Sequence, residues 1–463
     1  MTPSLTHTKW SGLWFVLVVL LSGLLVGAVL LPTGGRTARA DPGIIYVDAD
    51  AAGTSHDGLS WATAFTNLQD ALDAAGNGDE IWVASGVYTP GVARTDTFTL
   101  SAGVAMYGGF PPGGGDGTFQ ARDWETYLTV LSGDIGGDDG TDASGVVTDT
   151  ANIVGDNAYH VVTGDGVAET AGLDGFTISA GSADGDWPQS CGGGMYNYDN
   201  SSLKLTNVTF RGNEAESHGG GIFNYGTLTV DRCTFASNQT GGMGAGVASF
   251  NGVMTVNSTA LYDNEATLNG GGVCSSDGIL VVNNSTFSGN RASEGLLDNY
   301  GGGGIYCLAY YQAAETTINN STIASNSAKF GGGICSNGGR MSLKNTIVAH
   351  NMVHAGGEGP NCSSSDTITT SYNLESGTDC EFIGTGDLQD VDARIGFLQD
   401  NGGPTWTHAL WADSPAINAG SCTDIFGNPV TTDQRGVRRI GPCDIGAYEY
   451  VLRAYLPLVL RNG

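Results

Sequence analysis

The stretch GGGIFNYGTLTVDRCTFASNQT, residues 219–240, contains the two motifs that decide the fold. A triple glycine followed by an apolar residue opens it, and an aromatic-x-x-Asn motif, Phe235 to Asn238, lies near its end. Between the two motifs, apolar and polar residues alternate as they do in a half-buried β-strand. Versions of this stretch recur from about residue 190 to residue 351. A period of this length is typical of a stacked repeat array.

Both motifs keep their phase along the array. The asparagines follow one another at intervals of 25, 26, 26, 36 and 25 residues, so one interval contains an insertion. The glycine motif, complete or degraded, ends at Gly194, Gly221, Gly246, Gly272, Gly304 and Gly333. The second motif ends at Asn213, Asn238, Asn264, Asn290, Asn326 and Asn351.

In each repeat an apolar residue precedes the aromatic position by five residues, as Val230 precedes Phe235. Side chains alternate along a strand, so two residues an odd number apart cannot both face inward on one straight strand. We therefore predict a bend between them, and three short strands with three corners in each repeat. The glycine clusters argue against helical repeats. The prediction is an all-β fold, a right-handed parallel β-helix solenoid.

Stacked coils place equivalent residues about 4.8 Å apart. The column that contains Phe235 is then the apolar core, and the asparagines form a structural ladder of side-chain amides at a corner. Glu265 and Arg291 follow the ladder asparagine in adjacent coils and are expected to form a surface ion pair.

The residues before the array predict a leader and a cap. Lys9 precedes the apolar run 13–31, and Ala38-Arg39-Ala40 offers a small-x-small cleavage site, so residues 1–40 are predicted to be a signal peptide. The apolar run is also just long enough for an uncleaved membrane anchor, which is the alternative. Apolar residues at helical spacing within 61–75 predict a short N-terminal capping helix, because a solenoid must cover its end.

Composition limits the partners of the chain. Lys and Arg number 18 against 47 Asp and Glu, for a net charge of −29. Such a surface repels nucleic acid and anionic membranes, and it favours small cations as partners. Membrane contact is expected only through the N-terminal segment, if that segment is not cleaved.

Export to an oxidising compartment would allow disulfides. Two pairs lie in loop-rich regions after the repeats, and we predict that they are bonded: Cys362 with Cys380, and Cys422 with Cys443. Cys274 and Cys335 share one repeat position two coils apart, about 9–10 Å, which is too far for a disulfide. They are predicted to be buried and unpaired.

The glycine-rich and Phe-x-x-Asn repeats resemble those of polymorphic outer-membrane proteins and, more broadly, right-handed parallel β-helix proteins with a pectate-lyase-like fold. The resemblance covers about residues 44–353. A second block resembles a choice-of-anchor Q domain, through 401-NGGPT-405, 414-SPAINAG-420, 433-DQRG-436 and 444-DIGAYE-449. Asn418 departs from the aspartate usual in that family. The resemblance implies a bacterial surface protein, whose C-terminal anchoring stays open.

These observations divide the chain into five segments. They are a signal peptide (1–40), a cap with irregular coils (41–190), regular repeats (191–353), an anchor-Q-like module (354–450) and a short tail (451–463).

One loop before the regular repeats is the best metal candidate. Residues 133–142 alternate Asp with Gly, and flexible turns rich in carboxylate oxygens suit calcium. The predicted ligands are Asp134, Asp138, Asp139 and Asp142, and a solvated polar loop without an ion is the alternative. No other cofactor is expected.

Several tyrosines lie near the glycine motifs and could stack on sugar rings if they are exposed, although core packing would explain them equally well. We single out Tyr300, Tyr306 and Tyr310 in the insertion 292–311, because long loops on solenoids commonly carry function.

The favoured function is a secreted or cell-surface β-helix protein with a structural or adhesive role, which binds a polysaccharide or another cell-envelope component. The alternative is a calcium-dependent polysaccharide lyase or a glycoside hydrolase acting on an acidic glycan. A lyase of this fold would need calcium held by acids and an Arg or Lys base. The basic residues of the repeats, Lys204 and Arg232 among them, do not fall in an acid cluster that recurs from coil to coil.

Overall fold

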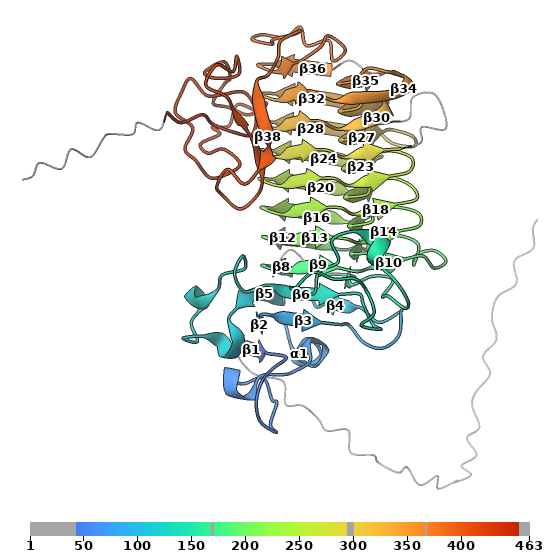
Figure 1. Ribbon diagram of the computed structural model, residues 1–463, viewed down its shortest axis with the longest axis vertical. Coiled ribbons are helices and arrows are strands. Elements are labelled where there is room, and N and C mark those ends of the chain that lie inside the picture. Colours follow the sequence, from blue (N-terminus) through green and yellow to red (C-terminus); the bar gives the residue numbers. More distant parts are fainter. Residues whose placement is uncertain (1–42, 168–170, 294–300, 366–367, 453–463) are drawn as a thin grey trace, which may run out of the picture. The chain divides into compact units, whose positions relative to one another are not determined.

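The computed structural model describes residues 43–452 apart from 168–170, 294–300 and 366–367. In Figure 1 the strands of successive coils lie one above another, from the blue β1 to the orange β36. The strands of each coil pair in parallel with those of the next, which confirms the right-handed parallel β-helix. The predicted signal peptide and most of the predicted tail lie outside the described residues.

An eleven-stranded sheet runs the length of the solenoid. Each residue pairs with its equivalent one coil further on, as Val230 pairs with Val256. Its strands, in spatial order, are β1 Ile44–Val47, β2 Glu80–Ala84, β5 Ala105–Phe110, β8 Gly172–Asp174, β12 Ser202–Thr206, β16 Thr227–Asp231, β20 Val253–Asn257, β24 Ile279–Asn283, β28 Glu315–Asn319, β32 Arg340–Lys344 and β36 Ile368–Ser371.

A ten-stranded sheet follows it around each coil, after the predicted bend. The bend is a single residue with positive φ, for example Arg232 at 53° and Ser258 at 47°. The strands of this sheet are β3 Gly86–Tyr88, β6 Thr129–Ser132, β9 Thr177–Ser179, β13 Thr209–Arg211, β17 Thr234–Ala236, β21 Ala260–Tyr262, β25 Thr286–Ser288, β29 Thr322–Ala324, β33 Ile347–Ala349 and β37 Leu374–Glu375.

A nine-stranded sheet closes each coil and begins at the glycine motif. Gly219 adopts φ +66°, and a Cβ on Gly220 would lie 2.3 Å from the carbonyl oxygen of Gln239 in the next coil. The motif is therefore needed for both backbone conformation and close stacking. The strands are β4 Phe98–Leu100, β7 Val162–Gly164, β11 Met195–Asn197, β15 Ile222–Asn224, β19 Val247–Phe250, β23 Val273–Ser276, β27 Ile305–Leu308, β31 Ile334–Asn337 and β35 Cys362–Ser364.

A fourth, seven-stranded sheet corrects the prediction of three strands in each coil. Most of its strands hold only two residues directly after the ladder asparagine, a length too short to show periodicity in the sequence. They are β10 Ser182–Ala183, β14 Glu214–Ala215, β18 Gln239–Thr240, β22 Glu265–Ala266, β26 Arg291–Ala292, β30 Ser327–Phe330 and β34 Met352–Glu358. Here Glu265 pairs with Arg291, and their side chains form the expected ion pair at 3.4 Å.

The interior follows the predicted columns. Phe210 and Phe235 stack with ring centroids 5.0 Å apart and planes 3° from parallel. The inward aromatic or aliphatic residue is fully buried in each regular coil, at Phe210, Phe235, Leu261, Phe287, Ile323 and Val348. Such a core is continuous because every coil buries its apolar face against its neighbours.

The capping helix α1, Leu68–Ala74, is shorter than the predicted segment 61–75. Asn67 caps its N-terminus by accepting a hydrogen bond from the Gln69 N–H at 2.8 Å. Phe65 instead forms a parallel bridge with Val47, so backbone pairing holds the chain extended just before the helix. Trp61–Thr63 form a separate 3-10 turn.

Both predicted disulfides are present, Cys362–Cys380 and Cys422–Cys443. Cys274 and Cys335 are buried and unbonded to each other, with Tyr306 between them in the stack. That arrangement agrees with the two-coil separation inferred from the repeat.

The residues after the last coil pack on the outer face of the ten-stranded sheet. They contain the hairpin β38, Ile395–Gln399, and β39, Thr407–Leu410. Trp406 stacks on Tyr262 with centroids 5.3 Å apart, and the Thr286 hydroxyl donates to the Gln434 side chain at 2.6 Å. Figure 1 shows this red segment beside the upper coils. Within the described part of the chain, no helix is long and apolar enough to cross a bilayer.

Candidate functional sites

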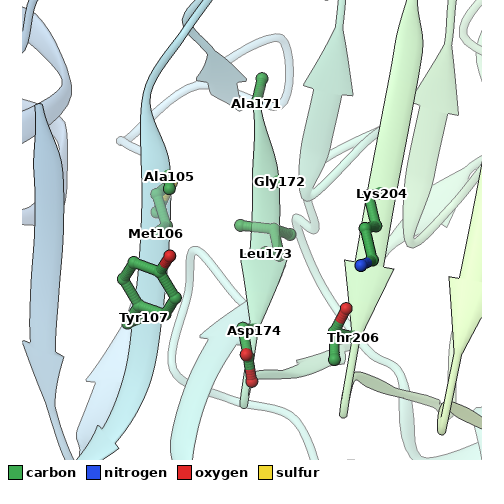
Figure 2. A pocket seen from close by; sticks show the side chains of 9 residues that line it. All are labelled: Ala105, Met106, Tyr107, Ala171, Gly172, Leu173, Asp174, Lys204 and Thr206. Carbon is green, nitrogen blue, oxygen red and sulfur yellow. The ribbon is translucent and has the colours of Figure 1, made fainter. Parts of the chain in front are cut away.

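A shallow groove lies on the outer face of the eleven-stranded sheet, over β5, β8 and β12. Figure 2 shows Tyr107 and Lys204 on either side of β8. Gly172 of β8 has no side chain, which leaves a cavity of 220 Å³ between its neighbours. Lys204 is exposed at the edge of this cavity, and Asp174 and Thr206 also line it.

Asp174, the acid that lines this groove, belongs to a chain of polar contacts. Arg122 binds the Asp174 carboxylate at 3.0 Å, and Asn207 donates to the same oxygen at 2.9 Å. Arg232 donates to Asn207 at 3.1 Å and pairs with Asp231, also at 3.1 Å. By contrast, Lys204 forms no ion pair within the described part of the chain. The groove therefore offers an uncommitted cation beside an acid that is already paired.

Arg122 also orders the aromatic end of the groove. Its guanidinium lies 5.1 Å from the ring centre of Tyr107 and 4.9 Å from that of Phe119, and it donates to the Gly108 carbonyl oxygen at 2.7 Å. Burial raises the pKa of the Tyr107 hydroxyl, and the nearby Glu80 carboxylate adds to this rise. Tyr107 is therefore a neutral hydrogen-bonding group at physiological pH.

A second cavity of 140 Å³ continues the site around the first corner of the coil. From the β-helix it is lined by Arg232, Asn207 and Thr209. Trp124 and Glu125 line it from the loop after β5, and Pro404 lines it from the C-terminal module. The sequence placed Lys204 and Arg232 near equivalent strand positions. It did not identify Arg122 or Trp124, which come from a loop outside the regular repeat.

Two acids near these cavities are held in ion pairs. A glycosidase needs one carboxyl group that carries a proton and a second that acts as base or nucleophile. Asp174 pairs with Arg122 at 3.0 Å, and Asp231 pairs with Arg232 at 3.1 Å. A lyase would need acids free to hold calcium beside the basic residue, whereas Asp174, the acid that lines the groove with Lys204, is paired with Arg122.

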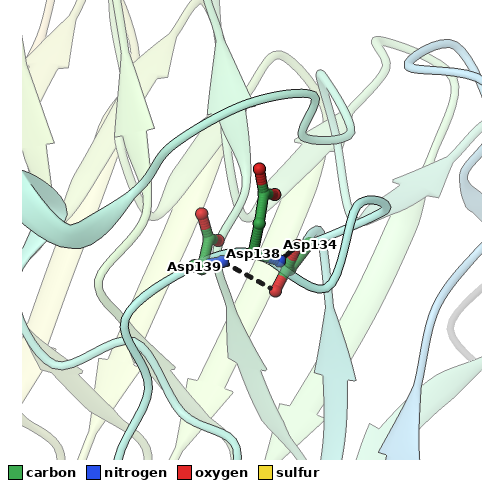
Figure 3. A group of neighbouring side chains, drawn as sticks. All are labelled: Asp134, Asp138 and Asp139. Carbon is green, nitrogen blue, oxygen red and sulfur yellow. Dashed lines mark hydrogen bonds between the residues drawn. The ribbon is translucent and has the colours of Figure 1, made fainter.

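The predicted metal loop lies elsewhere, against the corner between the ten- and seven-stranded sheets. Asp134, Asp138 and Asp139 each offer an oxygen, and these oxygens lie within 4.8 Å of one another (Figure 3). Asp142 is not part of this group, because its carboxylate accepts the N–H groups of Ser144 and Val146 in its own turn. Three of the four predicted ligands are therefore brought together.

Much of the capacity of these aspartates is used to hold the loop. Asp134 accepts the N–H groups of Gly137, Asp138 and Asp139, and Asp139 accepts from the Val154 N–H and the Asn157 amide, both at 2.7 Å. Burial raises the pKa of Asp139, and the negative charges of its two neighbours add to this rise. A cation would relieve that repulsion.

The predicted tyrosine site is not formed as expected. Tyr306 is fully buried on the outer side of the nine-stranded sheet, between Cys274 and Cys335, so it has no exposed ring face for a sugar. Tyr310 is 69% exposed and packs edge-on against Tyr311. Tyr300 lies outside the described residues.

The structure gathers partly exposed aromatic side chains at another place on the same sheet. Tyr198, Tyr225 and Phe250 follow β11, β15 and the equivalent part of β19, and Trp187 lies beside them. A signal was present in the sequence, since Tyr198 and Tyr225 are one repeat apart. Their exposure depends on the connecting turns, which the repeat does not specify.

The fold and its repeats define a parallel β-helix repeat protein. A family model described as "Chlamydia polymorphic membrane protein (Chlamydia_PMP) repeat" matches residues 207–225 and 284–308. This match and the parallel sheets support the resemblance of the repeats to polymorphic membrane-protein repeats. A comparison with curated proteins gives no match.

Among solved structures, pectate lyase Pel9A is similar with a TM-score of 0.54 and 14% identity, over 90% of this chain and 98% of the lyase. A rhamnogalacturonan lyase is similar with a TM-score of 0.44 and 10% identity, over 80% of this chain and 96% of that one. At these identities the likeness shows a shared fold alone.

Proposed function

We propose that this chain is a secreted or cell-surface β-helix protein that binds an acidic polysaccharide in the groove over β5, β8 and β12, without cleaving it. The observation that carries the proposal is the uncommitted cation Lys204, placed in the gap at Gly172 beside Asp174, which already pairs with Arg122. A sugar carboxylate would pair with Lys204, and sugar hydroxyl groups would bond to Thr206 and Tyr107.

The surface location rests on three supports. The repeats match a family of membrane-protein repeats, both pairs of late cysteines are disulfide-bonded, and the surface is strongly acidic. Disulfides persist mainly in oxidising compartments outside the cytosol. The adhesive role and the envelope partner are part of the same proposal.

The test is binding and turnover measured on the same samples. The full chain is titrated with polygalacturonate and with alginate, with and without calcium, and new reducing ends and unsaturated ultraviolet-absorbing ends are followed. We expect binding that weakens with salt and no turnover. Lys204→Ala should weaken binding about tenfold, which corresponds to about 1.4 kcal/mol.

Arg340→Ala is the matched control, because Arg340 is an exposed cation on β32 of the same sheet. Equal loss in both variants would mean that general charge attraction, not the groove, holds the polysaccharide. Turnover of either substrate would instead support the alternative, a calcium-dependent lyase or a hydrolase, and would overturn the non-catalytic proposal.

A further inference from the structure

Three equivalent positions on neighbouring coils carry aromatic rings on the outer side of the nine-stranded sheet. Asn197 pairs with Asn224, and Asn224 with Ser249, so the residues that follow them, Tyr198, Tyr225 and Phe250, are stacked along the sheet. We call Trp187, Tyr198, Tyr225 and Phe250 the aromatic surface. It lies on a different sheet from Lys204 and shares no residue with the groove described above.

Buried rings support this surface from below. Tyr196 and Phe223 are almost fully buried, and their ring centres lie 4.4 Å from Tyr198 and 4.9 Å from Tyr225. Trp187 is 56% exposed and packs edge-on against Phe223 and Tyr225 at 5.7 and 6.2 Å. Aromatic side chains have few rotatable bonds, so a surface supported in this way can bind with little loss of conformational entropy.

A cavity of 440 Å³ opens on this surface, lined by Tyr198, Asp199, Tyr225 and Asn251. It arises from unequal turns between the nine- and eleven-stranded sheets. After Tyr225 the chain passes through Gly226 alone before β16 begins, whereas the coils on either side insert Asp199 and Asn251. The short middle turn leaves a gap between two polar side chains, over the ring of Tyr225.

The rim of the cavity is polar and acidic. Asp199 and Asn251 are exposed, and neither Lys nor Arg is among the residues that line this cavity in the described chain. Asp165 also lies close enough for its charge to act on the Tyr198 hydroxyl. Carboxylate and amide groups bond well to hydroxyl groups, but this charge repels a ligand that carries carboxylates.

We propose that the aromatic surface is a second binding site, for a polysaccharide that carries no carboxylate groups. The apolar C–H face of a pyranose ring stacks on Tyr225 or Tyr198, and ring hydroxyls bond to Asp199 and Asn251. The cavity volume falls in the range of ordinary small-ligand sites, roughly 300–1,000 Å³, so it accommodates a short stretch of a glycan chain. The two sites together would let one protein bridge two kinds of polysaccharide.

The test uses the full chain with three uncharged probes, cellohexaose, xylohexaose and mannohexaose, and polygalacturonate as the acidic comparison. Binding is measured by isothermal titration calorimetry and by quenching of tryptophan fluorescence, since Trp187 packs against Tyr225, which lines the cavity. We expect binding of at least one uncharged hexasaccharide, weakened about tenfold or more by Tyr225→Ala and by Trp187→Ala. Tyr225→Phe should retain most of the binding, because it keeps the ring.

Two controls separate this site from the groove at Lys204. Tyr311→Ala removes a tyrosine that is 83% exposed elsewhere, and it should leave binding unchanged. Lys204→Ala should weaken polygalacturonate binding alone, so failure of one proposal is distinguishable from failure of the other. Circular dichroism of each variant verifies that the β-helix is intact.

Three results would overturn the inference. The first is no binding of any uncharged probe, and the second is binding that persists in folded Tyr225→Ala and Trp187→Ala variants. The third is loss of uncharged-probe binding in Lys204→Ala, which would mean that one groove accounts for both ligands.

Discussion

Asn264 Oδ1 accepts two hydrogen bonds from Asn238 of the preceding coil, one from its backbone N–H at 3.1 Å and one from its side-chain amide at 2.9 Å. The Asn264 amide in turn donates to the Phe235 carbonyl oxygen at 2.9 Å and to Asn290 at 2.8 Å. The same pattern repeats along the ladder and ends on Asn361. Without these contacts the corner would bury backbone N–H and carbonyl groups that have no partners. The asparagine side chains supply the hydrogen bonds.

Asn264→Ala should therefore destabilise the middle of the array. It leaves buried groups of Asn238 and Phe235 without partners, at about 1–3 kcal/mol for each group, so we expect a loss of about 3 kcal/mol in the free energy of unfolding. The measurement is urea unfolding followed by circular dichroism. Asn200→Ala, in an exposed turn, is the control and should change little. Equal midpoints in the two variants would show that the ladder contributes no stability.

Glu375 introduces a dependence of stability on pH at the end of the β-helix. It is fully buried beside the Cys362–Cys380 disulfide, and its carboxyl group accepts the Cys380 N–H at 2.8 Å. Burial raises the pKa of Glu375 to about 7, and the adjacent Asp379 carboxylate adds to the rise. The folded-state pKa of Glu375 exceeds its unfolded value. The contribution of this carboxyl group to stability is therefore fully present below about pH 4.5 and is lost as the pH rises through about 7.

In the parent chain we expect the free energy of unfolding to fall by up to about 3 kcal/mol between about pH 5 and about pH 8. Glu375→Gln should remove this fall. Urea unfolding at the two pH values measures this for the variant and the parent chain. Glu381→Gln, at an exposed neighbour, should keep the dependence of the parent. If the free energy of unfolding of Glu375→Gln still fell between the two pH values as it does in the parent chain, other acids would be responsible for the pH dependence.

The aspartate loop gives a prediction about calcium. Asp138 is exposed and its carboxylate holds no backbone group among the described residues, so Asp138→Asn removes a ligand without loosening the loop. We expect calcium to raise the melting temperature of the parent chain by mass action, and chelator to reverse this rise. Asp138→Asn should abolish the effect, whereas Asp142→Asn, outside the cluster, should preserve it. A calcium response that is the same in both variants would rule out this site.

Arg439 ties the C-terminal module to the β-helix. Its side chain is fully buried and donates to Glu449 at 3.1 Å, to the Gly446 carbonyl oxygen at 2.6 Å and to Asn284 of the β-helix at 3.3 Å. Arg439→Met leaves Glu449 buried without its cation, which costs about 3–5 kcal/mol.

Limited proteolysis and hydrogen exchange should then report loosening of residues 395–450, while β12 to β24 keep their protection. Arg438→Met, at the exposed neighbouring arginine, is the control. Loosening of the whole solenoid in Arg439→Met would contradict an effect confined to the module.

The repeat predicts the placement of some candidate site residues but not of others. Tyr306 occupies the same repeat position as Cys274 and Cys335, which are buried. This equivalence predicts that Tyr306 is buried too, although it lies in the insertion. The spacing of the acids predicts Asp142 as a fourth calcium ligand. In the structure its carboxylate instead accepts a hydrogen bond from Ser144 within a separate turn. The sequence does not predict Arg122 as a site residue, because a side chain that reaches the groove from an irregular loop leaves no periodic pattern.

The amino-acid sequence by itself determined the coil, the bend, the inward column, the asparagine ladder and both disulfides. The first four depend on the relation of a residue to its equivalent one period away, which the spacing contains. The disulfides were predicted from cysteine pairs in the loop-rich regions after the repeats. Only the tertiary structure decided the short fourth strand, the extended backbone before α1 and the docking of the C-terminal module on the ten-stranded sheet. It also decided the cavity lined by Tyr198 and Tyr225, because a concave site depends on how turns of unequal length stack in space.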